Sequence, residues 1–213
     1  MKDKKRTLLK LVVYGMVWLI MPIAFGNAAS VLEVTMDEML QQSQFIFEGR
    51  VIAVESREND RKRIHTYVTF EILDVIKGEY QSNIITLRFL GGTVGDVTLS
   101  VSDMQLPRQG EQGIYFVESL ERTQVHPLYG WSQGHFTVVR DASGIARVLT
   151  NRGLPVTGAK GETPAGQAGT VLEQTLSHGA SRDVVVGQAG EDHSGLTVDA
   201  FKNILLERMG KSR

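Results

Sequence analysis

Apolar and polar residues alternate through much of the centre of this chain, with the two-residue period of a half-buried β-strand. In the stretch 64–76, for example, Val68 and Phe70 alternate with Thr69 and Glu71. The same pattern, together with many β-branched and aromatic residues, predicts about seven strand segments. They lie at 45–54, 64–76, 84–90, 97–101, 114–117, 135–139 and 145–149.

Turn signals separate these strands roughly every 8 to 15 residues, and no helical pattern lies between them. An Asn-Asp pair at 59–60 marks a hairpin tip, and the stretch 141–144 turns the last hairpin. Gly49, inside the first strand, predicts a bulge or a close approach of two chain segments. Short strands in this order favour a mainly β fold, an antiparallel barrel or sandwich, over a parallel α/β sheet.

Two short helices are predicted, one before and one after the β region. Thr35 and Glu38 have the spacing of a capping box, which predicts a helix over 36–42. Thr197 caps a second helix within 196–213, and that helix has an apolar face. The residues of this face are Phe201, Ile204, Leu205 and Met209. We expect this amphipathic helix to dock on the β domain or on a partner.

The first 29 residues have the pattern of a secretory signal peptide. A basic start precedes the almost wholly apolar run 11–25, and the small residues Ala28 and Ala29 follow. The apolar run is about 15 residues long, which is shorter than the roughly 20 residues that cross a bilayer. We therefore expect cleavage after Ala28 or Ala29 and export to the periplasm or the extracellular space. An uncleaved membrane anchor is the alternative.

Composition divides the remainder of the chain. The segment 151–200 contains no aromatic residue and is rich in Gly, Ala, Ser and Thr. Such a composition buries little apolar surface to offset the entropy of ordering. The sequence therefore predicts a β domain with its N-terminal helix at 30–154, a flexible Gly/Ala-rich linker at 155–195 and the final helix at 196–213.

Charge and cysteine content exclude several classes of protein. The net charge is −1, and the first 29 residues hold five basic residues and one acid, so the remainder carries −5. An acidic exported domain is not expected to bind nucleic acid, which requires a basic face. The chain has no cysteine. Disulfides, thiolate catalysis, cysteine-ligated zinc and lipid attachment to an N-terminal cysteine are therefore excluded.

The stretch from Phe45 to Leu149 resembles exported bacterial domains of the netrin-like type. It contains FIFEGRV at 45–51, a long strand ending in DVIKG at 74–78, ITLRFLGG at 85–92, and a Gly-Glu pair leading into IYFV at 114–117. The resemblance implies an OB-like antiparallel β-barrel, the fold of the tissue inhibitors of metalloproteases. Those inhibitors bind the zinc of a protease through an N-terminal cysteine, which this chain lacks. The resemblance therefore implies the fold but not the inhibition of metalloproteases.

One segment matches a catalytic motif. The stretch 130–134 reads G-x-S-x-G, the serine-hydrolase elbow, with Ser132 in the nucleophile position and His135 or His126 as the base. The motif normally sits on a strand-to-helix turn, but here a strand is expected to follow it. A glycine-flanked turn that packs Tyr129 and Trp131 on the barrel is therefore the preferred interpretation.

Other candidate sites are less specific. None of the five histidines has the spacing of a metal-binding pair, and we predict no metal and no cofactor. The loop containing Gly91, Gly92 and Asp96 lacks the lysine and the helix of a phosphate cradle, so it is expected to form a hairpin or a rim loop for binding. Tyr129 and Trp131 are expected either in the core or in an exposed contact patch.

The sequence as a whole predicts an exported, non-enzymatic binding module whose partner is a protein, such as a secreted protease or a component of the cell envelope. A serine hydrolase using Ser132 and a polysaccharide-binding module using Tyr129 and Trp131 are the alternatives. Membrane contact is expected only if the signal peptide is retained. The candidate binding residues are Tyr129, Trp131, Ser132, His135, Gly91, Gly92 and Asp96.

Overall fold

The computed structural model describes residues 33–102, 104–159, 179–188 and 195–210. The expected signal peptide at 1–29 and the centre of the expected linker lie outside these residues. The helices are α2 (Met36–Gln42), the short 3-10 helix η1 (Trp131–Gly134) and α4 (Val198–Arg208). Within the described ranges, no helix has the length and apolar character needed to cross a bilayer.

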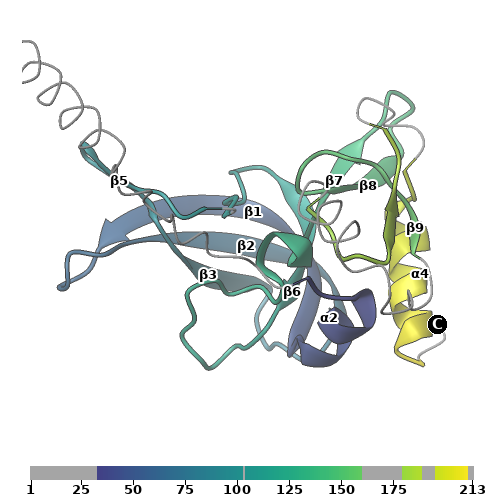
Figure 1. Ribbon diagram of the computed structural model, residues 1–213, viewed down its shortest axis with the longest axis horizontal. Helices are drawn as coiled ribbons and strands as arrows, with labels where there is room; N and C mark the ends of the chain where they lie inside the picture. Colours follow the sequence, from purple (N-terminus) through teal and green to yellow (C-terminus); the bar gives the residue numbers. More distant parts are fainter. Residues whose placement is uncertain (1–32, 103, 160–178, 189–194, 211–213) are drawn as a thin grey trace, which may run out of the picture. The chain divides into compact units, whose positions relative to one another are not determined.

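A six-stranded antiparallel sheet forms the centre of the fold (Figure 1). Its order is β3-β2-β1-β6-β7-β8, and the prediction of a mainly β protein with antiparallel strands is confirmed. The pairs between described residues leave β3 and β8 at the two edges. The strands are β1 (Phe45–Glu58), β2 (Ile64–Lys77), β3 (Ile84–Leu90), β6 (Gln112–Val117), β7 (His135–Arg140) and β8 (Ala146–Thr150).

Two small hairpins accompany the sheet. β4 (Gly92–Val94) pairs with β5 (Val97–Leu99), as the sequence predicts. β9 (Val156–Ala159) pairs with β10 (Val184–Val186), so two parts of the segment predicted as a flexible linker, 155–195, form a hairpin-like pair in the structure. The two strands supply each other's backbone hydrogen bonds, and Val156 of β9 and Val184 of β10 pack in a hydrophobic core.

The first half of β1 bends strongly. The pairing of β1 with β2 shifts register at three places, one of them between Glu48 and Gly49. A Cβ atom at Gly49 would lie 2.6 Å from the ring of Phe47, which is closer than real contacts allow. The predicted bulge and close approach at Gly49 are therefore confirmed, and each bulge adds twist to the sheet.

The inner parts of β1 and β6 are buried on both faces. In β6, Ile114 and Phe116 point to one hydrophobic core, whereas Tyr115 and Val117 point to another. We call the first the helix-side core, because α2 and α4 cover it with Met36, Met39, Leu40, Phe201 and Leu205. The second, the loop-side core, is covered by loop residues including Met104, Leu106, Leu120 and Leu128.

Helices α2 and α4 both begin where the sequence predicts. Thr35 and Glu38 form the complete capping box, and the hydroxyl of Thr197 accepts the backbone N–H of Ala200. The buried face of α4, however, is rotated from the expected one. Phe201 and Leu205 are buried, but Lys202 is buried with them, and Ile204 is only half-buried. A lysine in this position requires partners of opposite charge, because an unpaired buried charge is very costly.

Lys202 finds those partners on the sheet. Its ammonium donates to Asp74 of β2 at 2.9 Å and contacts the carboxylate of Glu48 of β1. Glu48 also accepts a hydrogen bond from the side-chain amide of Gln112 on β6. Burial acts to lower the pKa of Lys202, but its bonds to Glu48 and Asp74 outweigh this effect and raise the pKa above its usual value. Lys202 is therefore charged and ties α4 to β1 and β2.

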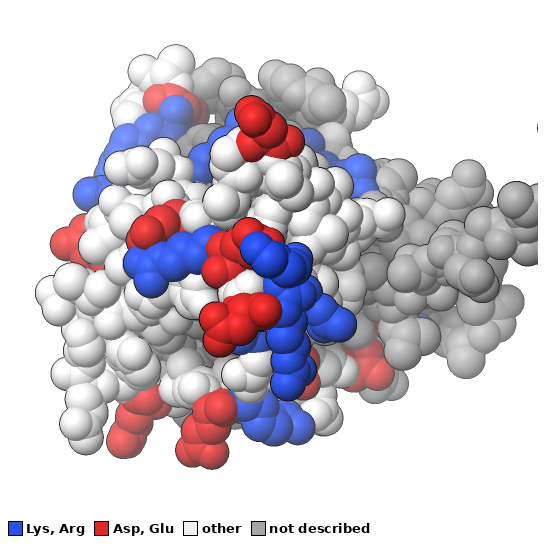
Figure 2. Space-filling model, turned by 90° about the vertical axis from the view of Figure 1, so that its left-hand side faces the viewer, with Lys and Arg blue, Asp and Glu red and all other residues white. Residues whose placement is uncertain are grey.

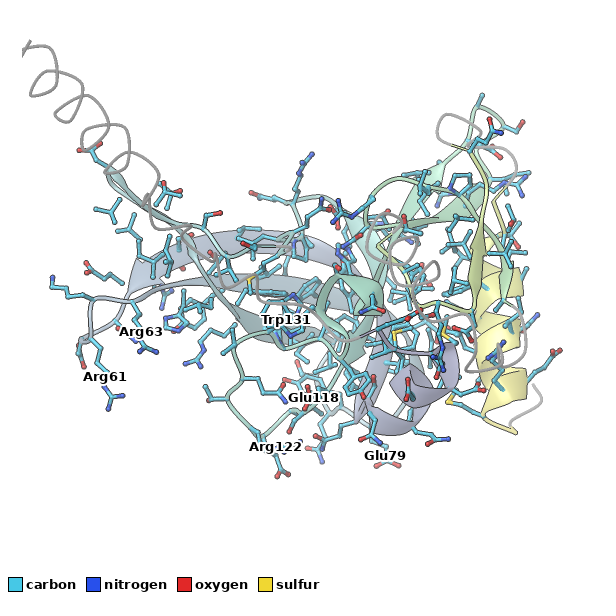
Figure 3. All side chains as sticks on the ribbon, in the orientation of Figure 1. Arg61, Arg63, Glu79, Glu118, Arg122 and Trp131 are labelled. Atoms are coloured by element: carbon cyan, nitrogen blue, oxygen red, sulfur yellow. The ribbon has the colours of Figure 1, made fainter. Side chains whose placement is uncertain are left out.

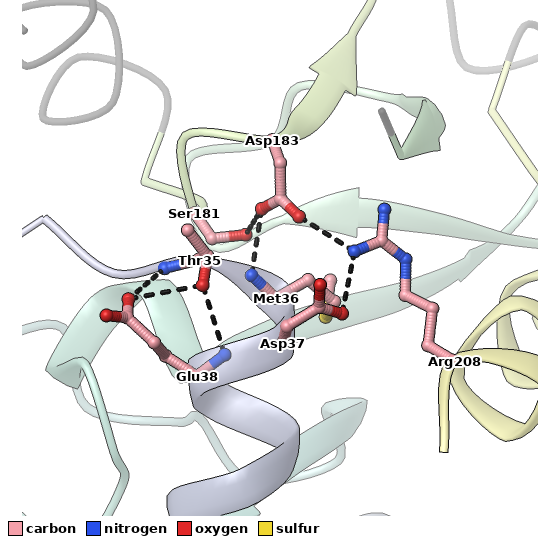
Figure 4. A network of polar contacts seen from close by, with 7 residues as sticks. All are labelled: Thr35, Met36, Asp37, Glu38, Ser181, Asp183 and Arg208. Atoms are coloured by element: carbon pink, nitrogen blue, oxygen red, sulfur yellow. Dashed lines mark hydrogen bonds and ion pairs between the residues drawn. The ribbon is translucent and has the colours of Figure 1, made fainter. Parts of the chain in front are cut away.

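A second polar network centres on Asp183 (Figure 4). Its buried carboxylate accepts the backbone N–H of Met36 at 2.8 Å, the hydroxyl of Ser181 at 2.9 Å and the guanidinium of Arg208 at 3.0 Å. The same guanidinium donates to Asp37 at 2.9 Å. One carboxylate thus joins the start of α2, the segment before β10 and the end of α4, and an acid at the N-terminus of a helix is favoured by the helix dipole.

Replacing Lys202 with methionine is expected to destabilise the fold. Lys202→Met keeps the apolar stem but leaves Glu48 buried without its cation, and removing one partner of a buried pair typically costs about 3 kcal/mol or more. Urea unfolding followed by circular dichroism gives this loss. Lys62→Met is the matched control, since the side chain of Lys62 is 84% exposed and pairs only loosely with Glu58. Equal midpoints for the two variants would contradict the assigned role of Lys202.

Candidate functional site

Of the candidate residues, Tyr129, Trp131, Ser132 and His126 lie in the β6–β7 loop, residues 118–134, and His135 begins β7. This loop folds back along the strand from which it comes. The N–H of Glu118 donates to the carbonyl of Pro127 at 3.0 Å, and the N–H of Tyr129 donates to that of Phe116 at 2.9 Å. A third bond, from the N–H of Leu90 to the carbonyl of Val125 at 3.2 Å, ties the loop to the end of β3. The loop thereby covers the loop-side core.

His126 anchors this loop inside the protein. It is buried between the ring of Phe89, which meets it edge-on at 5.2 Å, and the ring of Trp131, which stacks on it at 5.4 Å. Its Nδ1 accepts the backbone N–H of Leu128 at 3.1 Å, so Nδ1 carries no proton. Burial lowers the pKa of His126 to about 3, because the charged ring would lose its hydration. His126 is therefore neutral at ordinary pH.

Trp131 and Tyr129 are neither fully in the core nor fully exposed. Trp131, labelled in Figure 3, is half-buried and has a φ of 57°, a left-handed conformation that is uncommon for a residue other than glycine. Its stacking on His126 opposes the cost of that backbone conformation. Tyr129 is also half-buried and packs against the helix-side core. The two rings of the expected contact patch thus belong to different sides of the loop.

The hydrolase motif does not form a catalytic arrangement among the described residues. Ser132 lies in η1, which is only four residues long and is followed by β7, whereas the elbow motif requires a strand-to-helix turn. The carbonyl of Ser132 accepts the backbone N–H of His135. No hydrogen bond joins its hydroxyl to His126 or His135 in the part of the chain that the structure describes. Residues 130–134 instead form a short turn that begins and ends with glycine.

His135 belongs to a buried polar cluster that the sequence analysis missed. Its Nε2 lies 2.9 Å from Oε1 of Glu111, and its ring stacks on that of Tyr115 at 4.8 Å. Burial and the neighbouring negative Glu111 raise the pKa of Tyr115 well above its usual value. No spacing rule could have found this cluster, because His135 comes from β7, whereas Tyr115 lies in β6 and Glu111 just before it. Cross-strand pairing of Tyr115 with His135 is the cause.

Gly91 and Gly92 direct the β4–β5 hairpin across the sheet. Both have positive φ values, 101° and 124°, which confirms that glycine is needed for the turn. The hydroxyl of Thr66 donates to the carbonyl of Gly91 at 2.7 Å, and it also lies 2.9 Å from the hydroxyl of Ser56. Asp96 is exposed at the tip of the hairpin. A role of this loop in binding stays a prediction.

The two candidate loops extend from the end of β3 toward different parts of the sheet. The end of β3 contacts the β6–β7 loop through Leu90 and Phe89, whereas the β4–β5 hairpin continues away over β1 and β2. Between β3 and the β6–β7 loop lies a groove of about 320 Å³. Its lining includes residues that the sequence analysis did not select: Tyr67, Thr86, Leu87, Arg88, Leu120 and Arg122.

No group of three or more histidine, aspartate or glutamate side chains in the described ranges is arranged to hold a metal ion. Comparisons with protein-family models, with curated proteins and with solved structures find no match to this chain. The resemblance to netrin-like domains therefore stays a prediction, and the function has to be argued from the chain's own surfaces.

Gly92→Ala is expected to displace the β4–β5 hairpin. A Cβ atom at this position would lie 2.2 Å from Oγ1 of Thr66 and 2.5 Å from Oγ of Ser56. The positive φ alone costs an L-residue roughly 1–2 kcal/mol, and the collision adds to it. Gly95→Ala is the control, because its φ is also positive but nothing lies within 4 Å. Thermal unfolding should rank Gly92→Ala well below Gly95→Ala, and a reversed order would refute the close contact.

The free energy of unfolding should fall as the pH drops below about 6.5, the pKa of histidine in an unfolded chain. The pKa of His126 is about 3 in the folded state and about 6.5 when unfolded, so only the unfolded chain gains this proton between those values. The contribution of His126 is present in full above pH 6.5 and falls by about 2 kcal/mol between pH 7 and pH 5. His126→Asn keeps an acceptor for Leu128 but does not titrate. Urea unfolding at both pH values should show a smaller loss for His126→Asn, and an equal loss would contradict this assignment.

Proposed function

We propose that this chain is an exported, non-enzymatic binding module of the OB/netrin-like type, and that its partner is a protein. The observation that carries the proposal is the exposed apolar side chain of Val97 on the β4–β5 hairpin. Its exposed fraction is 63%, the largest among the large apolar residues that the structure describes. β4 lies against β1, where Ile52 and Val54 are also exposed. Exposed apolar side chains on the hairpin and on the strand that β4 contacts favour binding to another protein.

Exposed charged residues lie on β1 and at the tip of the β1–β2 hairpin. The tip of the β1–β2 hairpin carries Arg61 and Arg63, labelled in Figure 3, and exposed ion pairs join Arg57 to Glu55 and Lys62 to Glu58. Figure 2 views the molecule from this side, and basic and acidic side chains lie intermixed near its centre. Exposed charges of both signs near exposed apolar side chains are typical of interfaces between proteins that associate reversibly.

The class of partner follows from the expected export of the chain. A secreted protease or a component of the cell envelope would meet an exported module, and the hairpin end offers either one an apolar contact. A polysaccharide is less favoured, because sugar-binding sites use an exposed aromatic face and Trp131 instead stacks on His126. Catalysis by Ser132 is less favoured for the reason given above, that no histidine is bonded to it among the described residues.

Photo-crosslinking in the organism of origin tests this proposal. A photoreactive amino acid at Val97 should give one discrete cross-linked species of higher mass, since partner side chains would cover this position. The same amino acid at Ile145 is the matched control, because Ile145 is 43% exposed in the turn between β7 and β8, at a different surface. The proposal is overturned if Val97 yields no adduct, or if Ile145 gives the same species with equal yield.

A further inference from the structure

β3 is an edge strand whose outward backbone groups face the groove. The carbonyl of Asn83 faces β2, where it accepts the N–H of Ile72, whereas the N–H of Leu90 points away from β2 and donates to the carbonyl of Val125. Because backbone direction alternates along a strand, even-numbered residues point outward. Thr86 and Arg88 therefore direct their N–H and carbonyl groups into the groove. Within the described part of the chain, these groups have no hydrogen bond to the β6–β7 loop.

The side chains of β3 divide into two faces. Ile85 and Leu87 are buried toward the loop-side core, whereas Thr86 and Arg88 lie on the opposite, solvent-facing side. There the hydroxyl of Thr86 contacts that of Thr69 at 3.0 Å. A strand added beside β3 would continue both faces, with one set of side chains near Leu87 and the other near Arg88.

The β6–β7 loop forms the far wall of the groove. Leu120 and Pro127 supply apolar contacts, and the bond between Leu90 and Val125 closes one end. The loop stands against the edge strand without pairing along it, so the space beside Thr86 and Arg88 is bounded but open. A second copy of β3, which belongs to a whole sheet, fits such a walled space poorly. A single extended chain fits it well.

The charges that line the groove indicate which side chains a bound peptide would carry. Its lining contains the cations Arg88 and Arg122 and the single anion Glu121. Figure 3 shows Arg122 beside Glu118 on the loop, and these two pair loosely at 3.7 Å. Arg88 has no carboxylate partner within 4 Å among the described residues. A carboxylate on the incoming chain, directly opposite Arg88, would complete the pairing.

We propose that the edge of β3 binds an extended peptide in which acidic residues alternate with small apolar ones. The peptide backbone bonds to Thr86 and Arg88 and adds one strand to the sheet. Its acidic side chains lie on the face of Arg88, and its apolar side chains face Leu87, Leu120 and Pro127. This inference extends the proposed protein binding to a second surface, and its test uses different residues from those of the crosslinking experiment.

Fluorescence anisotropy with synthetic peptides tests the proposal on the intact protein. The probe is a labelled peptide of about seven residues that alternates Glu and Val. Its control has the same composition with the Glu and Val residues in separate blocks, and a second control replaces Glu by Lys. We expect the alternating Glu peptide to bind at least about tenfold more tightly than either control. Equal affinity for the block control, or for the Lys peptide, overturns the proposal.

Protein variants separate the contribution of the backbone from that of the side chains. Thr86→Pro removes only an outward N–H, which an edge strand tolerates, and should weaken binding at least about tenfold. Thr86→Val keeps the N–H and should bind as the wild type does. Arg88→Gln should weaken binding of the Glu peptide, whereas Arg63→Gln, a change at the hairpin tip, should not. Unchanged binding by Thr86→Pro refutes strand addition.

Modified peptides repeat the test without altering the protein, so it stands even if Thr86→Pro fails to fold. Methylation of alternate backbone nitrogens should abolish binding in one register of the peptide and spare it in the other, because only every second N–H faces β3. Equal effects in both registers contradict the proposal. Sedimentation is measured in parallel, and a dimer that Thr86→Pro dissolves would assign the edge to a second copy of the chain instead.

Discussion

The inner ends of β1 and β6 must be covered on both faces, and much of the remaining structure supplies that cover. Their side chains alternate between two cores, so a single layer packed on the sheet could bury only half of them. Helices α2 and α4 cover one face. The other face is closed by loop segments that contribute Met104, Leu106, Leu120 and Leu128. The protein therefore pairs a regular, helical layer with an irregular one.

The helical layer is held by charge as well as by apolar contact. α4 has only three turns, and its apolar face alone specifies neither its direction nor its rotation. Lys202 fixes both, because its carboxylate partners stand on β1 and β2. Asp183 fixes the start of α2 against the end of α4. Buried ion pairs add little net stability compared with apolar packing, so their effect here is chiefly on the choice of one arrangement.

Signals from neighbouring residues in the sequence predicted the helices and strands well. Contacts between residues that are distant in the sequence could not be predicted. The capping box at Thr35, the bulge at Gly49 and the hairpin after Gly92 each depend on neighbouring residues, and each was predicted. The burial of Lys202 depends on carboxylates more than a hundred residues away in the sequence, and the pairing of His135 with Glu111 depends on strand register. The groove was missed for the same reason, since its walls come from separate parts of the chain.

The irregular layer explains why the groove exists. A loop that covers a core must satisfy its own backbone groups, and the β6–β7 loop does so mainly by bonding back to itself and to β6. Among the backbone bonds of the described residues, that of Val125 alone joins the loop to β3, so the loop covers the loop-side core without completing the edge of the sheet. An exposed edge is a hazard for aggregation, which proteins limit with short strands and charged residues. β3 has both features, since it is seven residues long and carries Arg88. The open edge of β3 and the loop that stands beside it thus both follow from the need to cover the core with a loop.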